Sequence, residues 1–222
     1  MTTLSPNPNL GTQQSPITLK GLTPAELGVE IGWDGLVLTP VADGYNPTRK
    51  LKAAATRKTG YLRMDGERYV PVDLHWHFPA EHHLGNRGRV YDSEAHIVHI
   101  HKDDVPWALQ GRLDHCRIAV VGVFLKSGRE PYAPFSVAAS MGEDGAKPVK
   151  VARDEIIPTD SQAIRYSGSL TTPPYSENVT FIIFDQPMTA NKRQLVDDGL
   201  PNARPIQGRN RRYCLLGDVH CK

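Results

Sequence analysis

The sequence predicts a mostly β fold in a single domain. Short segments rich in β-branched and aromatic residues recur along the chain, each bounded by turn-forming residues. The 18 prolines and 19 glycines are spread as turn formers and do not gather in a linker or a low-complexity stretch. A length of 222 residues also suits one all-β domain.

The strands follow from apolar or alternating runs of residues. In chain order, the predicted strands are residues 35–39, 69–74 with the continuation 74–78, 95–100, 118–125 and 178–184. Helix signals are fewer. Residues 23–27 have a threonine cap and a first-turn proline, and residues 189–196 have the pattern of one modest helix. We therefore expect a few short helices around a sheet.

Two of these strands carry histidines in a pattern that suits a metal ion. Side chains alternate across a strand, so His75 and His77 point the same way, and His96 shares a face with Glu94 and Val98. Neutral imidazoles are good zinc ligands, and three protein ligands leave the fourth tetrahedral position to water, as in catalytic sites. The pattern therefore predicts a catalytic zinc site.

A histidine in a strand is more often a packed or surface residue, so the pattern alone does not decide. The second pair, His99 and His101, shows how easily such a spacing arises, and it faces away from the third predicted ligand. The context favours the first pair. Glu81 follows it, Glu94 precedes the third histidine, and a Thr-Thr-Pro-Pro loop comes at 171–174. Each of these would have a function beside a zinc-bound hydroxide.

The chain resembles the α-class carbonic anhydrases in six motifs that occur in the order of that family. The motifs are Gln-Ser-Pro-Ile at 14–17, His-Trp-His at 75–77, Ala-Glu-His at 80–82, Glu-Ala-His-Ile-Val-His at 94–99, Tyr-Ser-Gly-Ser-Leu-Thr-Thr-Pro-Pro at 166–174 and Asn-Ala-Arg-Pro-Ile-Gln at 202–207. The resemblance implies a large central twisted sheet, mainly antiparallel, with short peripheral helices. It implies a catalytic domain at 14–212, between an amino-terminal arm at 1–13 and a carboxy-terminal tail at 213–222.

The resemblance implies reversible hydration of carbon dioxide to bicarbonate and a proton by zinc-bound hydroxide. Zn²⁺ would be held by His75, His77 and His96. The second ring nitrogen of each ligand needs a partner that fixes the ring, and the implied partners are Asp73 for His75, the backbone carbonyl of Asn202 for His77, and Glu94 for His96. The family's commonest residue at the position of Asp73 is glutamine. A carboxylate accepts more strongly, so we expect a more basic ligand.

The family match also implies the residues around the substrate. Thr171 would donate to Glu81 and accept from the hydroxide, because one hydroxyl can do both. Without the resemblance, Thr171 would be read as an ordinary turn residue and Glu81 as a surface carboxylate. The implied pocket residues, which could equally be simple core, are Val98, Val120, Leu170, Thr172 and Phe181, the last at a position where tryptophan is more usual.

The proton route departs from the family pattern. Fast members use a histidine in a strand before the first ligand pair, but no histidine precedes His75 in this chain. Lys50 lies near the shuttle position, and a lysine with a pKa of about 10.4 is a poor relay at neutral pH. We therefore expect slow proton release that is assisted by external buffer, unless Tyr45 or Lys52 provides another route.

Composition limits the partners and the compartment. A net charge of +2, from 26 basic and 24 acidic residues, does not favour nucleic-acid binding, and the basic cluster at 209–212 lacks interleaved aromatic residues. No apolar run is long enough to span a bilayer, and residues 1–10 lack the apolar core of a signal peptide. We expect a soluble, cytoplasmic protein without nucleic-acid or membrane partners. A trimmed chain would leave a periplasmic or secreted location open.

Further features bear on assembly and redox state. Only thirteen residues precede the 14–17 motif, so the family's aromatic amino-terminal segment is largely missing, and exposed apolar surface there would fit a second subunit in a homo-oligomer. Cys116 lies in an apolar strand context and is expected to be buried and inert. Cys214 and Cys221 could pair or stay free.

Two classes of function remain. The alternative to the enzyme is a carbonic-anhydrase-like binding or structural module with little catalysis. Non-catalytic relatives usually lose a zinc-ligand histidine, whereas this chain keeps all three histidines together with Glu81 and Thr171. We therefore favour the enzyme. A basic nucleic-acid-binding domain is a third reading, supported by the arginine clusters alone.

Overall fold

The computed structural model describes residues 11–41, 50–58, 60–140, 147–195 and 201–222. In this part the protein is mostly β. Its strands are β1 (Thr18–Leu19), β2 (Thr23–Pro24), β3 (Val29–Ile31), β4 (Gly35–Pro40), β5 (Lys50–Ala55), β6 (Leu62–Met64), β7 (Glu67–His77), β8 (His83–Leu84), β9 (Ser93–His101), β10 (Ile118–Gly128), β11 (Val149–Ala152), β12 (Ala163–Gly168), β13 (Val179–Phe184), β14 (Met188–Asn191), β15 (Leu215–Gly217) and β16 (His220–Cys221). The helices are α1 (Val105–Ala108) and α2 (Ala133–Ala139), with 3₁₀ turns at Leu113–His115 and Arg153–Glu155. No helix among the described residues is long and apolar enough to cross a membrane.

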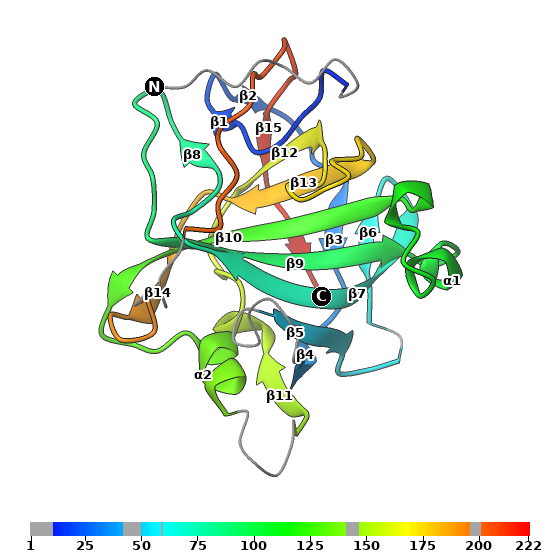
Figure 1. The fold of residues 1–222 in the computed structure, drawn as a ribbon, viewed down its shortest axis with the longest axis vertical. Helices are drawn as coiled ribbons and strands as arrows, with labels where there is room; N and C mark the ends of the chain where they lie inside the picture. Colours follow the sequence, from blue (N-terminus) through cyan, green and yellow to red (C-terminus); the bar gives the residue numbers. More distant parts are fainter. Residues whose placement is uncertain (1–10, 42–49, 59, 141–146, 196–200) are drawn as a thin grey trace.

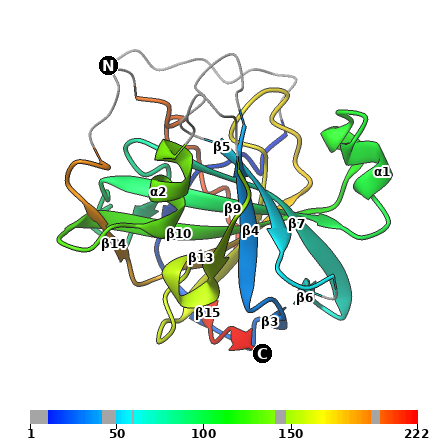
Figure 2. The ribbon, with the colours of Figure 1, turned by 90° about the horizontal axis from the view of Figure 1, so that it is seen from below.

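One large twisted sheet organises the molecule, in the order β11-β4-β5-β7-β9-β10-β13-β12-β15-β2. Most neighbours are antiparallel, and β10–β13 and β15–β2 are parallel pairs on this path. The long strands β7, β9 and β10 lie side by side across the middle of the molecule (Figure 1). Seen from below, β4 runs across the direction of β9 and β10, which shows the twist (Figure 2). The predicted fold class is confirmed.

The central strands are buried on both faces. Ile97 of β9 and Val121 of β10 belong to one apolar cluster, whereas Val98 and Val120 belong to the other. Successive side chains point to opposite faces of a strand, so the two clusters lie on the two sides of the sheet. A strand with both faces covered is commonly a nearly continuous apolar run, and this is why the sequence predicts β10 well.

The helix predicted at residues 23–27 is wrong, because Thr23–Pro24 forms β2 beside β15. The amides of Thr23 and Ala25 donate to the carbonyls of Cys214 and Leu216 at 2.9 Å. Pro24, which has no amide hydrogen, lies between these two donors at the end of the sheet path. An edge strand tolerates such a proline.

The helix predicted at residues 189–196 is also wrong over its described part. Met188–Asn191 is β14, which pairs in parallel with the end of β10, and residue 196 lies outside the described residues. Tertiary pairing outweighs a weak helix propensity here. The helices that form, α1 and α2, each carry proline in the first turn, at Pro106 and Pro134. That signal could have predicted them.

The segment expected as a tail, residues 213–222, contributes two strands to the sheet. Leu215–Gly217 forms β15 between β12 and β2, and His220–Cys221 forms β16 beside β3. Of the expected arm, residues 1–10 lie outside the described part. The chain's three cysteines are free thiols, with Cys116 and Cys214 buried and Cys221 exposed.

Candidate metal centre

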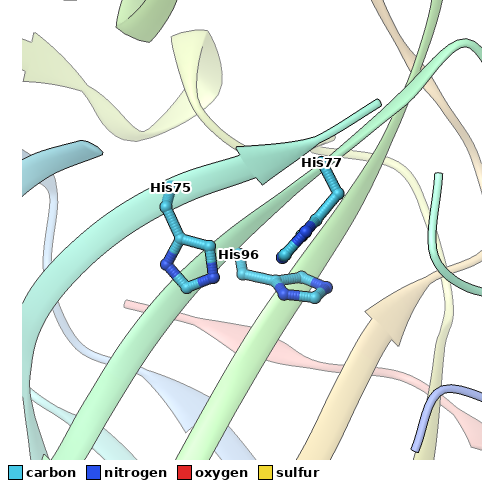
Figure 3. A group of neighbouring side chains, drawn as sticks. All are labelled: His75, His77 and His96. Atoms are coloured by element: carbon cyan, nitrogen blue, oxygen red, sulfur yellow. The ribbon is translucent and has the colours of Figure 1, made fainter. Parts of the chain in front are cut away.

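Strand periodicity and register bring three imidazoles together. His75 and His77 point to the same side of β7, and the antiparallel pairing places His96 of β9 directly opposite His75. One ring nitrogen of each lies within 4.8 Å of the others. The three side chains gather around a common point (Figure 3). The predicted juxtaposition of these histidines is therefore present in the structure.

Each imidazole contacts a neighbour through one ring nitrogen, which leaves its other nitrogen for the common point. The contacts are His75 Nδ1 to Asp73 Oδ1 at 2.5 Å, His77 Nδ1 to the Asn202 carbonyl at 3.4 Å, and His96 Nε2 to Glu94 Oε1 at 2.9 Å. The contact to Asn202 is longer than a usual hydrogen bond. The nitrogens that remain are Nε2 of His75, Nε2 of His77 and Nδ1 of His96.

The chemistry of these donors fits a zinc ion. Nε2 of His77 is buried and has no hydrogen-bond partner. Burial, together with the nearby His96 and His75, lowers the pKa of His77 well below its ordinary value, so its imidazole is neutral. A buried polar atom without a partner is costly, and a coordinated ion would satisfy it. Three neutral imidazoles are a usual donor set for catalytic Zn²⁺.

A buried hydrogen-bond network supports His96, the predicted ligand on β9. Glu94 accepts from Nε2 of His96 at 2.9 Å and contacts Nδ1 of His82 at 2.7 Å. Burial would raise the pKa of Glu94, but interactions with His82 and His96 outweigh it and hold the pKa well below its ordinary value. Beyond His82, Tyr166 Oη lies 2.5 Å from Nε2, and Ser15 Oγ lies 2.9 Å from the same hydroxyl.

The support from His82, Tyr166 and Ser15 was not predicted. All three residues lie in the motifs that carry the family resemblance, and that position is the signal that could have identified them. Their hydrogen bonds connect the amino-terminal segment to the predicted ligand His96 through side chains that are fully or almost fully buried.

Gly122 leaves room for Glu94. It pairs with His96 across β10 and β9 and with Ile183 across β10 and β13. A Cβ at this position would lie 3.2 Å from Glu94 Oε1 and 2.3 Å from Cδ1 of Ile183. Any larger residue would therefore crowd both neighbours, so the absence of a side chain is part of how the site is built.

Glu81 is almost completely buried beside the histidines. Its Oε1 accepts from the Arg204 amide at 2.9 Å, whereas its Oε2 has no partner. Oε2 lies 3.5 Å from His77 Nε2 and 4.0 Å from His96 Nδ1. Burial raises the pKa of Glu81. The carboxyl group is thus an acceptor facing the same space as the three free ring nitrogens.

The predicted hydrogen bond from Thr171 to Glu81 is not present in the structure. Thr171 is half-buried, and among the described residues no hydrogen bond joins it to the carboxylate. Thr172, the next residue, is exposed. The loop therefore lies in a geometry that leaves Oε2 of Glu81 without its expected donor.

Three of the predicted pocket residues form one row next to the histidines. Val98 pairs with Val120 across β9 and β10, and Val120 pairs with Phe181 across β10 and β13. Val98 follows His96 by two residues and therefore shares its face. Val120 and Phe181 are buried, and Val98 and Leu170 pack against the same apolar cluster. An apolar wall thus borders the imidazoles.

Lys50 lies opposite His75 on β5, and its Nζ is 3.2 Å from Oδ2 of Asp73. Burial would raise the pKa of Asp73, but the charges and hydrogen bonds of His75 and Lys50 lower it overall. The carboxylate is therefore ionised and contacts both residues. Tyr45, the other suggested proton route, lies outside the described residues.

The fold and the site define a class of protein, a β-sheet protein with three histidines on its central strands that could hold a metal ion. Residues 5–198 match the model of the eukaryotic-type carbonic anhydrase family, and the chain belongs to that family.

Relatives of known name agree with this assignment. The chain is 32% identical to alpha carbonic anhydrase 7 of Arabidopsis thaliana over 172 residues, which are 71% of this chain and 57% of the relative. It is 28% identical to a carbonic anhydrase of Klebsiella pneumoniae over 214 residues, 92% of this chain and 80% of the relative. The chain therefore spans little more than half the length of the plant relative.

Solved structures show the same architecture. The α-carbonic anhydrase of Thermovibrio ammonificans, in complex with the inhibitor sulfanilamide, has a TM-score of 0.72 at 29% identity, covering 93% of this chain and 88% of that one. The Photobacterium profundum α-carbonic anhydrase has a TM-score of 0.73 at 28% identity, covering 93% and 90%.

Proposed function

We propose that this protein hydrates carbon dioxide reversibly to bicarbonate and a proton, with Zn²⁺ held by His75, His77 and His96. The observation that carries the proposal is the convergence of three ring nitrogens on one point, with the buried Nε2 of His77 lacking a hydrogen-bond partner. Family membership supports the reaction class. Carbonic anhydrase is the name of the relatives in both Arabidopsis and Klebsiella.

The metal ion would supply the nucleophile. Zn²⁺ in such a site lowers the pKa of a coordinated water to about 7, a value known from carbonic anhydrase itself. The protein's part is to orient the ligands. Asp73 and Glu94 accept from the outward nitrogens of His75 and His96, which fixes the tautomers and turns the free nitrogens inward.

Glu81 and Thr171 would orient the reacting water. Oε2 of Glu81 is a buried acceptor without a donor, and such an atom normally has a hydrogen-bond partner in the working state. We assign that partner to the hydroxyl of Thr171, which can donate to the carboxylate and still accept a second hydrogen bond. This arrangement would require the 171–174 loop to move so that the hydroxyl reaches Oε2.

Carbon dioxide would bind against the apolar row. The substrate has no strong polar group, so dispersion contacts and exclusion of water provide its binding energy. Val98, Val120 and Phe181 present such a surface beside the imidazoles, and Leu170 packs against the same cluster. The exposed Thr172 would lie beside the bicarbonate product.

Proton release to solvent would be slow. No histidine precedes His75 in the chain, and the ammonium of Lys50 is paired with Asp73. External buffer would then accept the proton in the rate-limiting step at low buffer concentration.

Stopped-flow hydration of carbon dioxide by zinc-quantified protein, across a range of buffer concentrations, tests the proposal. We expect one zinc per chain, turnover that rises with buffer concentration, and loss of both zinc and activity in His96→Ala. The half-exposed His115 provides the matched control, because His115→Ala removes an imidazole away from the site. Stoichiometric zinc without hydration at any buffer concentration would instead favour the binding-module alternative.

A further inference from the structure

One carboxylate connects a lysine on β5 to a predicted metal ligand on β7. Oδ1 of Asp73 is 2.5 Å from Nδ1 of His75, and Oδ2 of the same group is 3.2 Å from Nζ of Lys50. The side chain of Asp73 is 16% exposed, and that of Lys50 is 45% exposed. Lys50 is thus the solvent-side member of a short series of contacts that runs through Asp73 to the imidazole of His75.

The register explains why Lys50 makes this contact. Lys50 pairs with His75, and Lys52 pairs with Asp73, so both lysines lie on the face of β5 that carries the site. Leu51 between them is buried on the opposite side. Of the two, Lys50 alone forms an ion pair with Asp73 in the described part of the chain. Lys52 carries the same charge and lies on the same face of β5, but it does not make this contact.

The ion pair is placed to affect the orientation of His75. A partly exposed pair contributes little to the stability of the fold. Its geometric effect would be larger, because a carboxylate held at Oδ2 has less freedom to rotate Oδ1 away from the ring of His75. Groups behind a metal ligand fix its tautomer and direction, and thereby set metal affinity.

We propose that Lys50 is a positioning residue of the metal centre, which holds the Asp73 carboxylate so that Nε2 of His75 faces the metal ion. This inference rests on the proposed function only in taking zinc as the ion bound by the three histidines. It gives Lys50 a role distinct from a proton relay.

The affinity of the full-length protein for Zn²⁺, measured by competition with a chelator, tests the role directly. Removing a lysine charge near the site strengthens zinc binding, because it removes electrostatic repulsion of the cation. Lys52→Met measures this electrostatic contribution alone, because Lys52 makes no ion pair with Asp73 in the described part of the chain. We expect Lys50→Met to bind zinc more weakly than Lys52→Met, by roughly threefold to tenfold, which is less than the 10–100-fold cost of losing a ligand's direct partner. Lys50→Arg, which keeps the ion pair, should restore most of the affinity.

Two further measurements separate this role from a general effect on the fold. In an Asp73→Asn background, Lys50→Met and Lys52→Met should bind zinc equally, because the carboxylate that transmits the effect is gone. In the zinc-loaded protein, the downfield ¹H resonance of the His75 Nδ1 proton should move upfield in Lys50→Met and stay in place in Lys52→Met. A folding defect would lower the thermal unfolding midpoint without this selective shift.

The outcomes are distinguishable. Equal zinc affinity of Lys50→Met and Lys52→Met in the natural background, or a Lys50→Met loss that persists with Asp73→Asn, would overturn the positioning role. If Lys50→Met folds poorly, Lys50→Gln provides the same comparison. Failure of the unsubstituted protein to bind zinc at all would instead refute the proposed function.

Discussion

The missing side chain of Gly122 leaves the space in which the carboxylate of Glu94 lies. Gly122 lies on β10, which pairs with β9, the strand that carries Glu94. A Cβ on Gly122 would be 3.2 Å from Oε1 of Glu94. Because Glu94 accepts from His96 and also contacts His82, a shift of its carboxylate would change two imidazoles together. Gly122, which has no side chain, therefore affects where the carboxylate of Glu94 and its two imidazole partners can lie.

Gly122→Ala should destabilise the protein by about 1–3 kcal/mol, as overpacking of a well-packed interior does. The new methyl group would meet Cδ1 of Ile183 at 2.3 Å before any relaxation. Urea unfolding of the zinc-free protein measures the change. Ile183→Val removes that Cδ1, so the double variant should be less destabilised than the sum of the two single variants. Strict additivity would show that Gly122 and Ile183 do not compete for this space.

Asp73→Gln should lower the pH midpoint of carbon dioxide hydration. A carboxylate accepts the Nδ1–H of His75 more strongly than an amide oxygen does, and so makes the imidazole a more basic donor. A more basic ligand leaves the metal less acidic, which moves the midpoint upward in the natural protein. The pH–rate profile checks this at fixed buffer concentration, with zinc content confirmed. An unchanged or higher midpoint in Asp73→Gln would contradict the argument.

Thr171→Ala should reduce turnover roughly 100-fold while zinc stays bound, because misplacement of a reacting group costs about that much. The buried Oε2 of Glu81 would then keep no donor. Thr171→Ser is the matched control, since it retains the hydroxyl and should retain most of the turnover. Steady-state hydration rates with parallel zinc determination test both variants. Full activity in Thr171→Ala would remove this residue from the mechanism.

A bulky side chain at Val98 should block the reaction without releasing zinc. Val98 follows His96 on the same face and pairs with Val120 in the apolar row. Val98→Trp would fill the proposed substrate space, whereas Val98→Ala enlarges it and should leave turnover largely intact. Hydration assays and zinc content distinguish the two. Normal turnover of the tryptophan variant would show that carbon dioxide binds elsewhere.

Asp104 gives the protein an acid-dependent part of its stability. Hydrogen bonds from the Arg117 guanidinium at 2.9 Å lower the pKa of Asp104 to about 2. A depressed carboxyl pKa stabilises the fold fully above the unfolded value near 4, and this stabilisation is lost as the pH falls toward the folded value. The stability difference between the natural protein and Asp104→Asn should therefore shrink from about pH 5 to about pH 3.

Urea unfolding at several pH values measures the effect of Asp104. The neighbouring Asp103, which is exposed and pairs with the exposed Lys102, is the matched control. Asp103→Asn should show a smaller dependence because solvent screens an exposed pair. A pH-independent difference for Asp104→Asn would mean that the carboxylate charge makes no contribution.

Among the central strands, β10 was predictable because burial on both faces makes its sequence almost continuously apolar from Ile118 to Leu125. β9 was recognisable from its β-branched residues between histidines, but its register with β7, with an irregularity between Pro71 and Asp73, is not given by the sequence. The short edge strands were not predictable. Thr23–Pro24 forms a strand because residues near 215 lie beside it, and no local pattern encodes a partner so distant in sequence.

The candidate site divides in the same way. Period-two alternation along β7 predicts that His75 and His77 point the same way, but only the pairing of β9 with β7 brings His96 to the same face. The contact between Lys50 and Asp73 depends on side-chain reach across two strands, which spacing does not give. The absent bond between Thr171 and Glu81 shows the converse case, in which a motif indicates a partnership that the loop geometry does not form.

The pairing of β2 with β15 gives the molecule two regions that differ in how they assemble. The histidine strands β7 and β9 are close in sequence and can pair as soon as both have been synthesised. The edge at β2 closes only when residues 215–216 return to residues 23–24. Contacts between distant segments form late because closing a long loop is entropically costly. We therefore expect amide hydrogens of β2 and β15 to exchange with solvent faster than those of β9, so that the metal centre persists while this edge opens.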